Sequence, residues 1–411
     1  MRKTTIKINK MNKHAISTAL ATALIAGMAS HSVMADDFYE SMTSGDGYIK
    51  FNLRYEGVDQ DNTLENASAL TLRTLLGYET GDYRGFSAKF EMEDSRIVMG
   101  QGDYSLGSTG YNVGQYSVIA DPETTELDQG YIQYKNDVLT AKLGRQVITL
   151  DGHRFVGHVG WRQDWQTFDA LSAKYTPNKD LTVSYAYITQ RNRIFAEAAD
   201  LDAKDHLINL SYKTSVGKLV GYSYLLEVDN NTDNALDTYG ISFTGSTKAG
   251  DTKVLYAAEY ATQISESATT NYDADYLKLE GGAVISGITA KLGYEVLGSD
   301  DGAYGFSTPL ATLHKFNGWS DQFLGTPSQG LVDAYVSVGA KLGGGGLTVI
   351  YHGFEADEAD DTVDDLGSEL NLVYVKKFAK NYVAGVKYAA YSAGDIKVDA
   401  DKLWVWVGAN F

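Results

Sequence analysis

The chain has 411 residues, and its 53 Asp and Glu outnumber its 35 Lys and Arg, which gives a formal net charge of -18 at pH 7. This acidic balance argues against nucleic acid as a partner, because nucleic-acid binding depends on Lys and Arg that neutralise phosphates. The absence of cysteine excludes disulfides, thiolate zinc sites and cysteine nucleophiles.

The N-terminal segment has the three parts of a secretory signal peptide. Its first 13 residues contain one Arg and four Lys, an apolar stretch follows from Ala15 to Met28, and Val33-Met34-Ala35 matches a small-residue cleavage signal. The apolar stretch is shorter than the roughly 20 residues that span a bilayer as a helix. We therefore predict a signal peptide over residues 1–35, whose removal leaves 30 Lys and Arg against 53 Asp and Glu.

Most of the remaining chain alternates between apolar and polar residues with a period of two, which is typical of strands. Between Tyr48 and Glu56, one face carries Ile, Phe, Leu and Tyr, and the opposite face carries Lys, Asn, Arg and Glu. Such alternation predicts eighteen strands, with sixteen as the nearest alternative count. They lie at residues 48–56, 67–79, 84–96, 126–135, 138–147, 164–176, 181–190, 204–214, 218–228, 237–246, 252–263, 272–284, 288–297, 331–342, 346–356, 366–378, 382–391 and 401–411.

The connections between these strands alternate between short and long. Short polar links follow the even-numbered strands, whereas most odd-numbered strands are followed by longer segments, above all residues 97–125 and 298–330. Short periplasmic turns and long external loops are the pattern of an outer-membrane β-barrel. We therefore predict one all-β domain at residues 36–411, a transmembrane antiparallel up-and-down barrel. The two longest loops either fold inward and narrow the channel or cover its outer mouth.

Charge segregation between strand faces supports a barrel wall in lipid. In the strand near Phe86, the face with Phe90 and Met92 has no charge, whereas the other face carries Lys89 and Glu91. A Lys or Arg that faces lipid at the bilayer midplane costs about 2 to 4 kcal/mol, so the charged faces must line the lumen. A barrel of about eighteen strands is too wide for side chains to fill, which predicts an aqueous channel.

The C-terminal sequence KLWVWVGANF alternates and ends on an aromatic residue. It resembles the signal that the bacterial barrel-assembly machinery reads, with Phe411 as its terminal residue; an ordinary amphipathic strand is the alternative. We expect a bacterial outer-membrane location, with outer-membrane lipid and lipopolysaccharide as further partners.

The segment Leu143–Leu171 holds the densest group of charged and aromatic residues, LGRQVITLDGHRFVGHVGWRQDWQTFDAL. A hairpin would bring Arg145, Arg154 and Arg162 to one side of the barrel, where guanidinium groups recognise carboxylates. Charges of this kind set selectivity in pores. The alternative is an arginine-aspartate network, with Asp151, Asp164 and Asp169, that braces the wall.

Two other chemistries receive less support. His153 and His158 lack a third metal ligand at a recognisable spacing, and no GxSxG motif accompanies them or His206 as a hydrolase base. The acidic run at residues 357–365 does not match an EF-hand loop, so a solvated loop is favoured over a calcium or magnesium site. We expect no catalytic residues, no cofactor and no metal.

The same segment resembles the alginate-export family of outer-membrane porins. The positions that carry the resemblance are Gly144, Arg145 and Gln146, then Arg154, then Arg162 and Gln163, and then Thr167, Phe168, Asp169 and Ala170. The resemblance implies an eighteen-stranded barrel, and the best-known family member carries an anionic uronic-acid polymer through a basic lumen. Here the predicted inward residues mix both signs: Lys50, Arg54, Arg73, Lys89, Lys142 and Lys174 with Glu56, Glu91, Glu93, Glu280 and Glu295. A channel is therefore implied more directly than alginate as its solute.

These observations predict a porin that passes hydrophilic, anionic solutes, oligosaccharides or polyuronates across the outer membrane by passive diffusion. The residues predicted to line the pore or set its selectivity are Arg145, Gln146, Arg154, Arg162, Gln163, Asp169, Arg54, Arg73 and Lys142. The alternatives are an outer-membrane barrel enzyme that acts on lipid or polysaccharide, and a soluble secreted β-rich binding protein.

Overall fold

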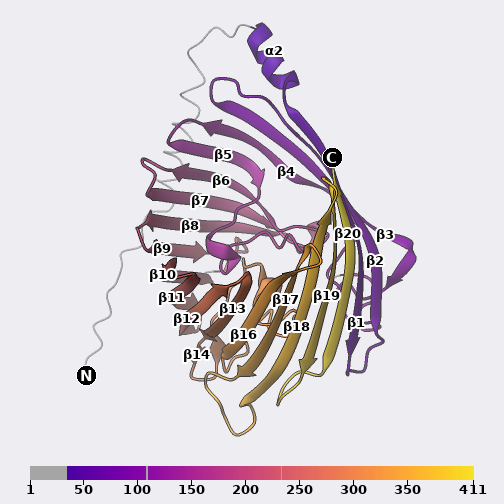
Figure 1. Cartoon of the computed structure of the whole chain (residues 1–411). Coiled ribbons are helices and arrows are strands. Elements are labelled where there is room, and N and C mark those ends of the chain that lie inside the picture. Colours follow the sequence, from indigo (N-terminus) through magenta and orange to yellow (C-terminus); the bar gives the residue numbers. More distant parts are fainter. Residues whose placement is uncertain (1–34, 108–109, 233) are drawn as a thin grey trace.

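The computed structural model describes residues 35–107, 110–232 and 234–411. Its main element is one closed antiparallel sheet of eighteen strands, which confirms the predicted count over its alternative of sixteen (Figure 1). The signal peptide remains a prediction, because residues 1–34 lie outside the described residues.

The barrel strands follow one another around the wall in chain order, apart from a small hairpin inside one loop. The strands are β1 (Asp46–Gln60), β2 (Ala67–Glu79), β3 (Phe86–Asp103), β4 (Thr124–Lys135), β5 (Leu139–Gln146), β6 (Thr167–Tyr175), β7 (Leu181–Asn192), β8 (Leu201–Lys213), β9 (Gly217–Leu226), β10 (Ala235–Ala249), β11 (Thr252–Glu266), β12 (Asn271–Ile285), β13 (Ile288–Leu297), β16 (Leu331–Leu342), β17 (Gly345–Glu355), β18 (Asp365–Phe378), β19 (Tyr382–Ser392) and β20 (Ala400–Asn410). The hairpin consists of β14 (Ser299–Asp300) and β15 (Tyr304–Gly305). A helix, α2 (Ala35–Thr43), precedes β1.

Closure depends on β1, which pairs with both β2 and β20, with Lys50 opposite Asn410 at one end. A closed sheet leaves no edge, so every strand can satisfy its backbone groups within the wall. The terminal residue takes part as well, because the backbone N–H of Phe411 donates to the carbonyl of Ile49. Among the described residues, no helix is long and apolar enough to cross a membrane.

The short connections are tight turns with backbone conformations that suit hairpins. At residues 343–344, Gly343 and Gly344 both have positive φ angles, of 56° and 83°. Two successive positive φ angles define the type I′ turn, whose twist matches that of antiparallel strands. The long connections all leave the opposite end of the barrel, so the predicted alternation of turns and loops is confirmed.

Many predicted strand boundaries differ from the structure by a few residues, and two of the differences have a clear physical cause. The strand predicted from residue 164 begins at Thr167, because Asp164 belongs to a loop, where its carboxylate accepts the backbone N–H of Ala196 at 2.9 Å. The loop predicted from residue 97 begins later, since β3 continues to Asp103. Both differences occur at the external ends of strands, where polar side chains bind loops rather than the wall.

Candidate functional site

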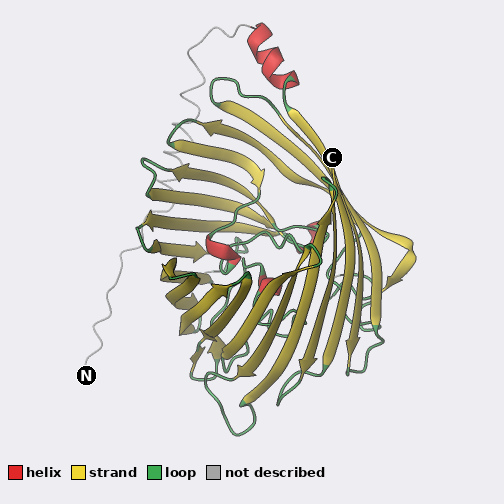
Figure 2. Cartoon of the chain, in the orientation of Figure 1, coloured by secondary structure: helices red, strands yellow, loops and turns green. Residues whose placement is uncertain are grey.

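Three of the described loops reach into the interior of the barrel: residues 104–107 with 110–123, residues 147–166, and the 298–330 loop beyond its β14–β15 hairpin. Figure 2 shows loop segments and short helical turns within the ring of strands. Each loop bonds to inward-facing strand residues, as the contacts below establish. Both long loops whose position was left open therefore fold inward, and the loop after β5 joins them.

Arg162 anchors the 147–166 loop to the wall at β1. Its Nη1 donates to Glu56 Oε2 at 2.8 Å, and its Nη2 donates to Asp321 Oδ2 at 3.0 Å. The neighbouring Gln163 donates its backbone N–H to Asp121 Oδ1 at 3.0 Å and its side-chain amide to Thr71 Oγ1 at 2.9 Å. Arg162 and Gln163 are buried, as are their partners Glu56, Thr71 and Asp121. The side chain of Asp321 is only 6% exposed.

Two arginines of the neighbouring strands complete this anchor. Arg54 on β1 donates to the carboxylate of Asp121 and to the carbonyl of Trp161. Arg73 on β2 donates to the carbonyl of Arg162 at 2.9 Å, and its guanidinium lies 4.7 Å from the centre of the Trp165 ring. These arginines therefore hold loops through carbonyls, carboxylates and ring faces.

Arg154 anchors the same loop to a second part of the wall, at β13. Its Nε donates to Glu295 Oε1 on β13 at 2.8 Å, and its Nη2 donates to Asn317 Oδ1 at 3.2 Å. Asn317 belongs to the 298–330 loop and also donates to Glu295 Oε2 at 2.9 Å. The 147–166 loop, which connects β5 to β6, is therefore a strap that is also fixed to β13 through Arg154 and to β1 through Arg162.

Asp321, in the 298–330 loop, joins this loop and the 147–166 loop to β20, which closes the barrel against β1. It accepts from Arg162, from Lys402 on β20 at 3.2 Å, and it lies 2.6 Å from His314 Nδ1. Burial and the neighbouring Lys387 and Arg162 lower the pKa of His314 to about 3, against the opposing effect of Asp321. Although burial acts to raise it, the contact with His314 and the charges of Lys402 and Arg162 hold the pKa of Asp321 well below its usual range.

Aromatic rings enclose the cation beside this carboxylate. Lys387 on β19 lies 4.4 Å from the Trp161 ring centre and 4.0 Å from that of Trp319, and its Nζ is 2.7 Å from His314 Nε2. Trp161 in turn stacks on His314 with ring centres 5.2 Å apart. The contact region around Asp321 and Lys387 therefore combines ion pairs with packed aromatic rings.

Arg145 does not join the other predicted arginines. It lies on the same face of β5 as Leu143, which is 56% exposed, and therefore points away from the lumen. Its Nε and Nη2 bind the two oxygens of Asp169 on β6 at 2.7 and 3.2 Å. This pair braces the outer wall near its external rim, whereas Gln146 points inward and bonds to the Ala170 carbonyl at 2.9 Å.

The histidines considered as ligands or bases lie apart from any candidate metal centre. His153 and His158 pack with ring centres 5.2 Å apart, and burial, with a smaller contribution from His153 and Arg73, lowers the pKa of His158 to about 4. His206 lies on β8 with its Nδ1 2.9 Å from Tyr185 Oη. Within the described ranges, no group of three or more His, Cys, Asp or Glu could hold a metal ion.

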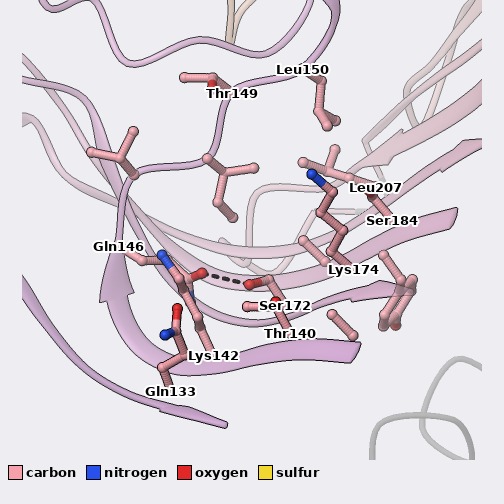
Figure 3. Close-up of a pocket in the computed structure, with 15 residues that line it drawn as sticks. Gln133, Thr140, Lys142, Gln146, Thr149, Leu150, Ser172, Lys174, Ser184 and Leu207 are labelled. Carbon is pink, nitrogen blue, oxygen red and sulfur yellow. Dashed lines mark hydrogen bonds between the residues drawn. The ribbon is translucent and has the colours of Figure 1, made fainter. Parts of the chain in front are cut away.

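A cavity of about 380 Å³ lies between the wall at β4 to β8 and the first residues of the 147–166 loop (Figure 3). Figure 3 shows Lys142, Lys174, Gln133 and Gln146 around it, and Gln146 accepts a hydrogen bond from Ser172 Oγ at 2.6 Å. The described residues that line it include no Asp or Glu. It therefore combines two ammonium groups with amides and hydroxyls, which is a polar surface that favours an anion.

Of the cavity residues, Lys142 and Gln146 were predicted to line the pore or set its selectivity, and Lys174 was predicted to face inward, whereas Gln133 and Ser172 were not assigned to the lumen. The signal for Ser172 is the period-two alternation, which places it on the same face of β6 as Lys174. Lys142 is held by Tyr131, whose hydroxyl is 3.2 Å from Nζ and whose ring centre is 4.3 Å away.

The lumen also carries lysines across from this cavity. Lys278 and Lys315 both approach the ring of Phe316, at 5.8 and 5.5 Å from its centre, and Lys315 donates to the carbonyl of Gly152 at 2.8 Å. Lys291 pairs with Glu280 at 2.9 Å. Burial, followed by Lys278 and Lys291, lowers the pKa of Lys315, as expected for neighbouring positive charges.

The two ends of the barrel carry opposite charge. Among the three residues at the turn end of each described strand, the charged ones are Asp46, Glu79, Lys135, Lys174, Lys213, Lys218, Lys248, Lys253, Lys341, Lys376 and Lys377. At the loop ends, by the same definition, they are Asp59, Asp103, Glu126, Arg145, Asp169, Arg191, Asp202, Asp237, Glu266, Asp273, Glu295, Asp333, Glu355, Asp365, Asp401 and Lys402. The turn end, which faces the periplasm in barrels of this kind, is rich in lysine, and the external end is acidic.

A closed eighteen-stranded wall with inserted loops and a polar lumen defines an outer-membrane β-barrel channel of bacteria. The family model described as alginate export matches residues 50–300, and the chain belongs to this family. A comparison with curated protein sequences gave no match.

Solved structures of channels share the fold at low sequence identity. OccK9 (OpdG) of Pseudomonas aeruginosa is 13% identical with a TM-score of 0.73, over 90% of this chain and 99% of that one. OccAB4 of Acinetobacter baumannii is 14% identical with a TM-score of 0.72, over 90% and 100%. OpdK of P. aeruginosa is 12% identical with a TM-score of 0.69, over 89% and 98%. The barrel architecture is thus shared although few residues are.

Proposed function

We propose that this channel passes small hydrophilic anions, including carboxylated saccharides, across the outer membrane by passive diffusion. The observation that carries the proposal is the acid-free cavity with Lys142 and Lys174 beside the 147–166 strap. Lysine ammonium groups are compact charges on flexible stems, so they attract a carboxylate without holding it in one geometry. Weak attraction of this kind suits a channel, because a solute must leave as readily as it enters.

The arginines have a different role in this proposal. Arg54, Arg154 and Arg162 are buried and paired with carboxylates of the wall or of other loops. A buried guanidinium that is already paired offers little to a passing solute, whereas its loss leaves a buried carboxylate without its partner. We therefore assign these arginines, and Gln163, to fixing the loops, and we assign selectivity to the lysines.

The neighbouring structures are consistent with a channel for organic anions. One structure of OpdK was determined with vanillate. We propose a channel and not an enzyme, because the histidines considered as bases do not form one site. His153 and His158 lie in the 147–166 loop, whereas His206 lies on β8. We also propose that lipopolysaccharide surrounds the wall and that the assembly machinery reads the terminal strand ending in Phe411.

A liposome-swelling assay tests the solute class. Purified mature protein in liposomes should admit a monomeric uronate faster than a neutral sugar of equal size. The variant Lys142→Gln/Lys174→Gln should lose this difference, while the control Lys204→Gln, outside the cavity, should keep it. Equal rates for the two solutes in the wild-type protein would overturn the proposal.

A further inference from the structure

The charge of the barrel changes sign along its axis. The external mouth carries acids at most strand ends, and the loop at residues 356–364 adds Asp357, Glu358, Asp360, Asp361 and Asp364 without a base. The periplasmic strand ends carry mainly lysines, and the turns between them add charges of both signs. The lysines of the lumen, such as Lys142 and Lys174, lie on the periplasmic side of the inserted loops. The two charged regions are separated by the loops that narrow the channel.

We propose that this polarity makes the channel a rectifier, in which anions pass more readily from the periplasm to the exterior than in the reverse direction. The proposal rests on the proposed function, an anion-conducting lumen, and adds a direction to it. Nothing in it requires an energy source, because a rectifier biases the conductance and leaves the equilibrium unchanged.

The physical reason is the distribution of mobile ions. Fixed lysines enrich anions at the periplasmic end, and fixed carboxylates enrich cations at the external end. When the exterior is electrically positive, anions move outward from the periplasmic end, where they are enriched. Cations move inward from the external end, where they are enriched. Both then accumulate at the constriction and raise the conductance. The opposite voltage drains ions of both signs from the constriction and lowers it.

Salt concentration sets when this effect operates. The Debye length is about 10 Å at 0.1 M salt and about 3 Å at 1 M, so fixed charges control the ions in the channel only at the lower concentration. We expect the currents at equal and opposite voltages to differ by about twofold or more in 0.1 M KCl. In 1 M KCl, the two currents should become equal.

The experiment uses mature protein in planar bilayers of neutral lipid, with the orientation of each channel determined. Because the chain has no cysteine, Ala359→Cys in the exposed external loop gives one site for a bulky, membrane-impermeant maleimide. Reaction from one chamber identifies the external side. Currents are then recorded at both polarities in symmetric KCl, and the reversal potential is recorded separately in a KCl gradient.

Two sets of variants test the origin of the asymmetry. Glu358→Gln/Asp361→Asn/Asp364→Asn removes charge from the external mouth, and Lys248→Gln/Lys253→Gln/Lys377→Gln removes it from the periplasmic mouth. These side chains are exposed, so both variants should fold. Each should bring the current ratio toward one. Equal currents in 0.1 M KCl from uniformly oriented wild-type channels would overturn the inference even if the reversal potential shows anion selectivity, whereas a reversal potential without anion preference would overturn the proposed function instead.

Discussion

Arg154 and Arg162 lie eight residues apart in one loop, yet they bind parts of the barrel wall that are six strands apart. Arg154 donates to Glu295 on β13 at 2.8 Å, and Arg162 donates to Glu56 on β1 at 2.8 Å. The short segment between them therefore crosses the lumen under restraint at both ends. This arrangement explains why a charged cluster that resembles an active site acts here as a strap.

Loss of the β1 anchor should loosen the strap. Arg162→Ala leaves Glu56 and Asp321 buried without a main cationic partner, which costs about 3 to 5 kcal/mol in such pairs. We expect lower thermal stability together with larger and noisier single-channel conductance. Arg145→Ala is the matched control, because its partner Asp169 lies on the outer wall. Unchanged conductance in the folded Arg162→Ala barrel would contradict the strap.

The β13 anchor should show strong coupling between its two charges. Arg154→Met and Glu295→Gln should each destabilise the protein, because each leaves a buried polar partner unsatisfied. The double variant should be destabilised by clearly less than the two single effects together. Urea unfolding in detergent measures all three. Additive effects would show that this pair does not hold the loop.

The stability that the neutral rings of His158 and His314 contribute should fall between pH 6.5 and about 3. Burial lowers the pKa of His158 to about 4 and that of His314 to about 3, both below the usual value of 6.5. Below pH 6.5 the unfolded chain therefore binds protons that the folded loops exclude, so the stability present above pH 6.5 is lost progressively as the pH falls. The charged and titratable groups that face these rings are Asp321, Lys387 and Arg162 for His314, and His153 and Arg73 for His158.

Thermal unfolding at pH 7.0 and pH 4.5 measures this dependence. His314→Gln/His158→Gln should show a smaller difference between the two pH values than the wild-type protein. A double variant with the same difference between the two pH values as the wild-type protein would contradict the assignment of neutral, buried rings.

The turn at residues 343–344 should be sensitive to β-branched substitution. Gly344 has a φ of 83°, and a valine at such a position is strained. Gly344→Val should lower stability by about 1 to 2 kcal/mol. Gly346→Val is the control, since it lies in the next strand with open space at its Cβ position. Equal effects of both changes on the unfolding temperature would show that the turn conformation is unimportant.

The strands could be predicted from the sequence because alternation is local. The strands that contain Phe86 and Lys142, for example, show their inward and outward faces within a few residues. Eighteen such strands close the wall. The inserted loops could not be predicted in this way. Arg154 and Glu295 are 141 residues apart, and Arg162 and Asp321 are 159 apart, so no local pattern indicates these pairs.

The alternation of inward and outward faces also explains which predicted pore residues lie at the cavity and which do not. Lys142 and Gln146 lie at the cavity, where alternation places them. Arg145 was grouped with Arg154 and Arg162 by proximity in sequence, but the parity of its strand position turns it outward with Leu143. The parity of its position in β5 is sufficient to distinguish Arg145 from the arginines of the inserted loop.

The reversal potential in a KCl gradient tests the central claim, that the lysines of the lumen select anions while the arginines hold the loops. Wild-type channels should prefer chloride, and Lys142→Gln/Lys174→Gln should lose much of this preference with unchanged thermal stability. Arg154→Met should instead lose stability while its reversal potential remains anionic. A preference that survives loss of both lysines but disappears with Arg154 would contradict the account.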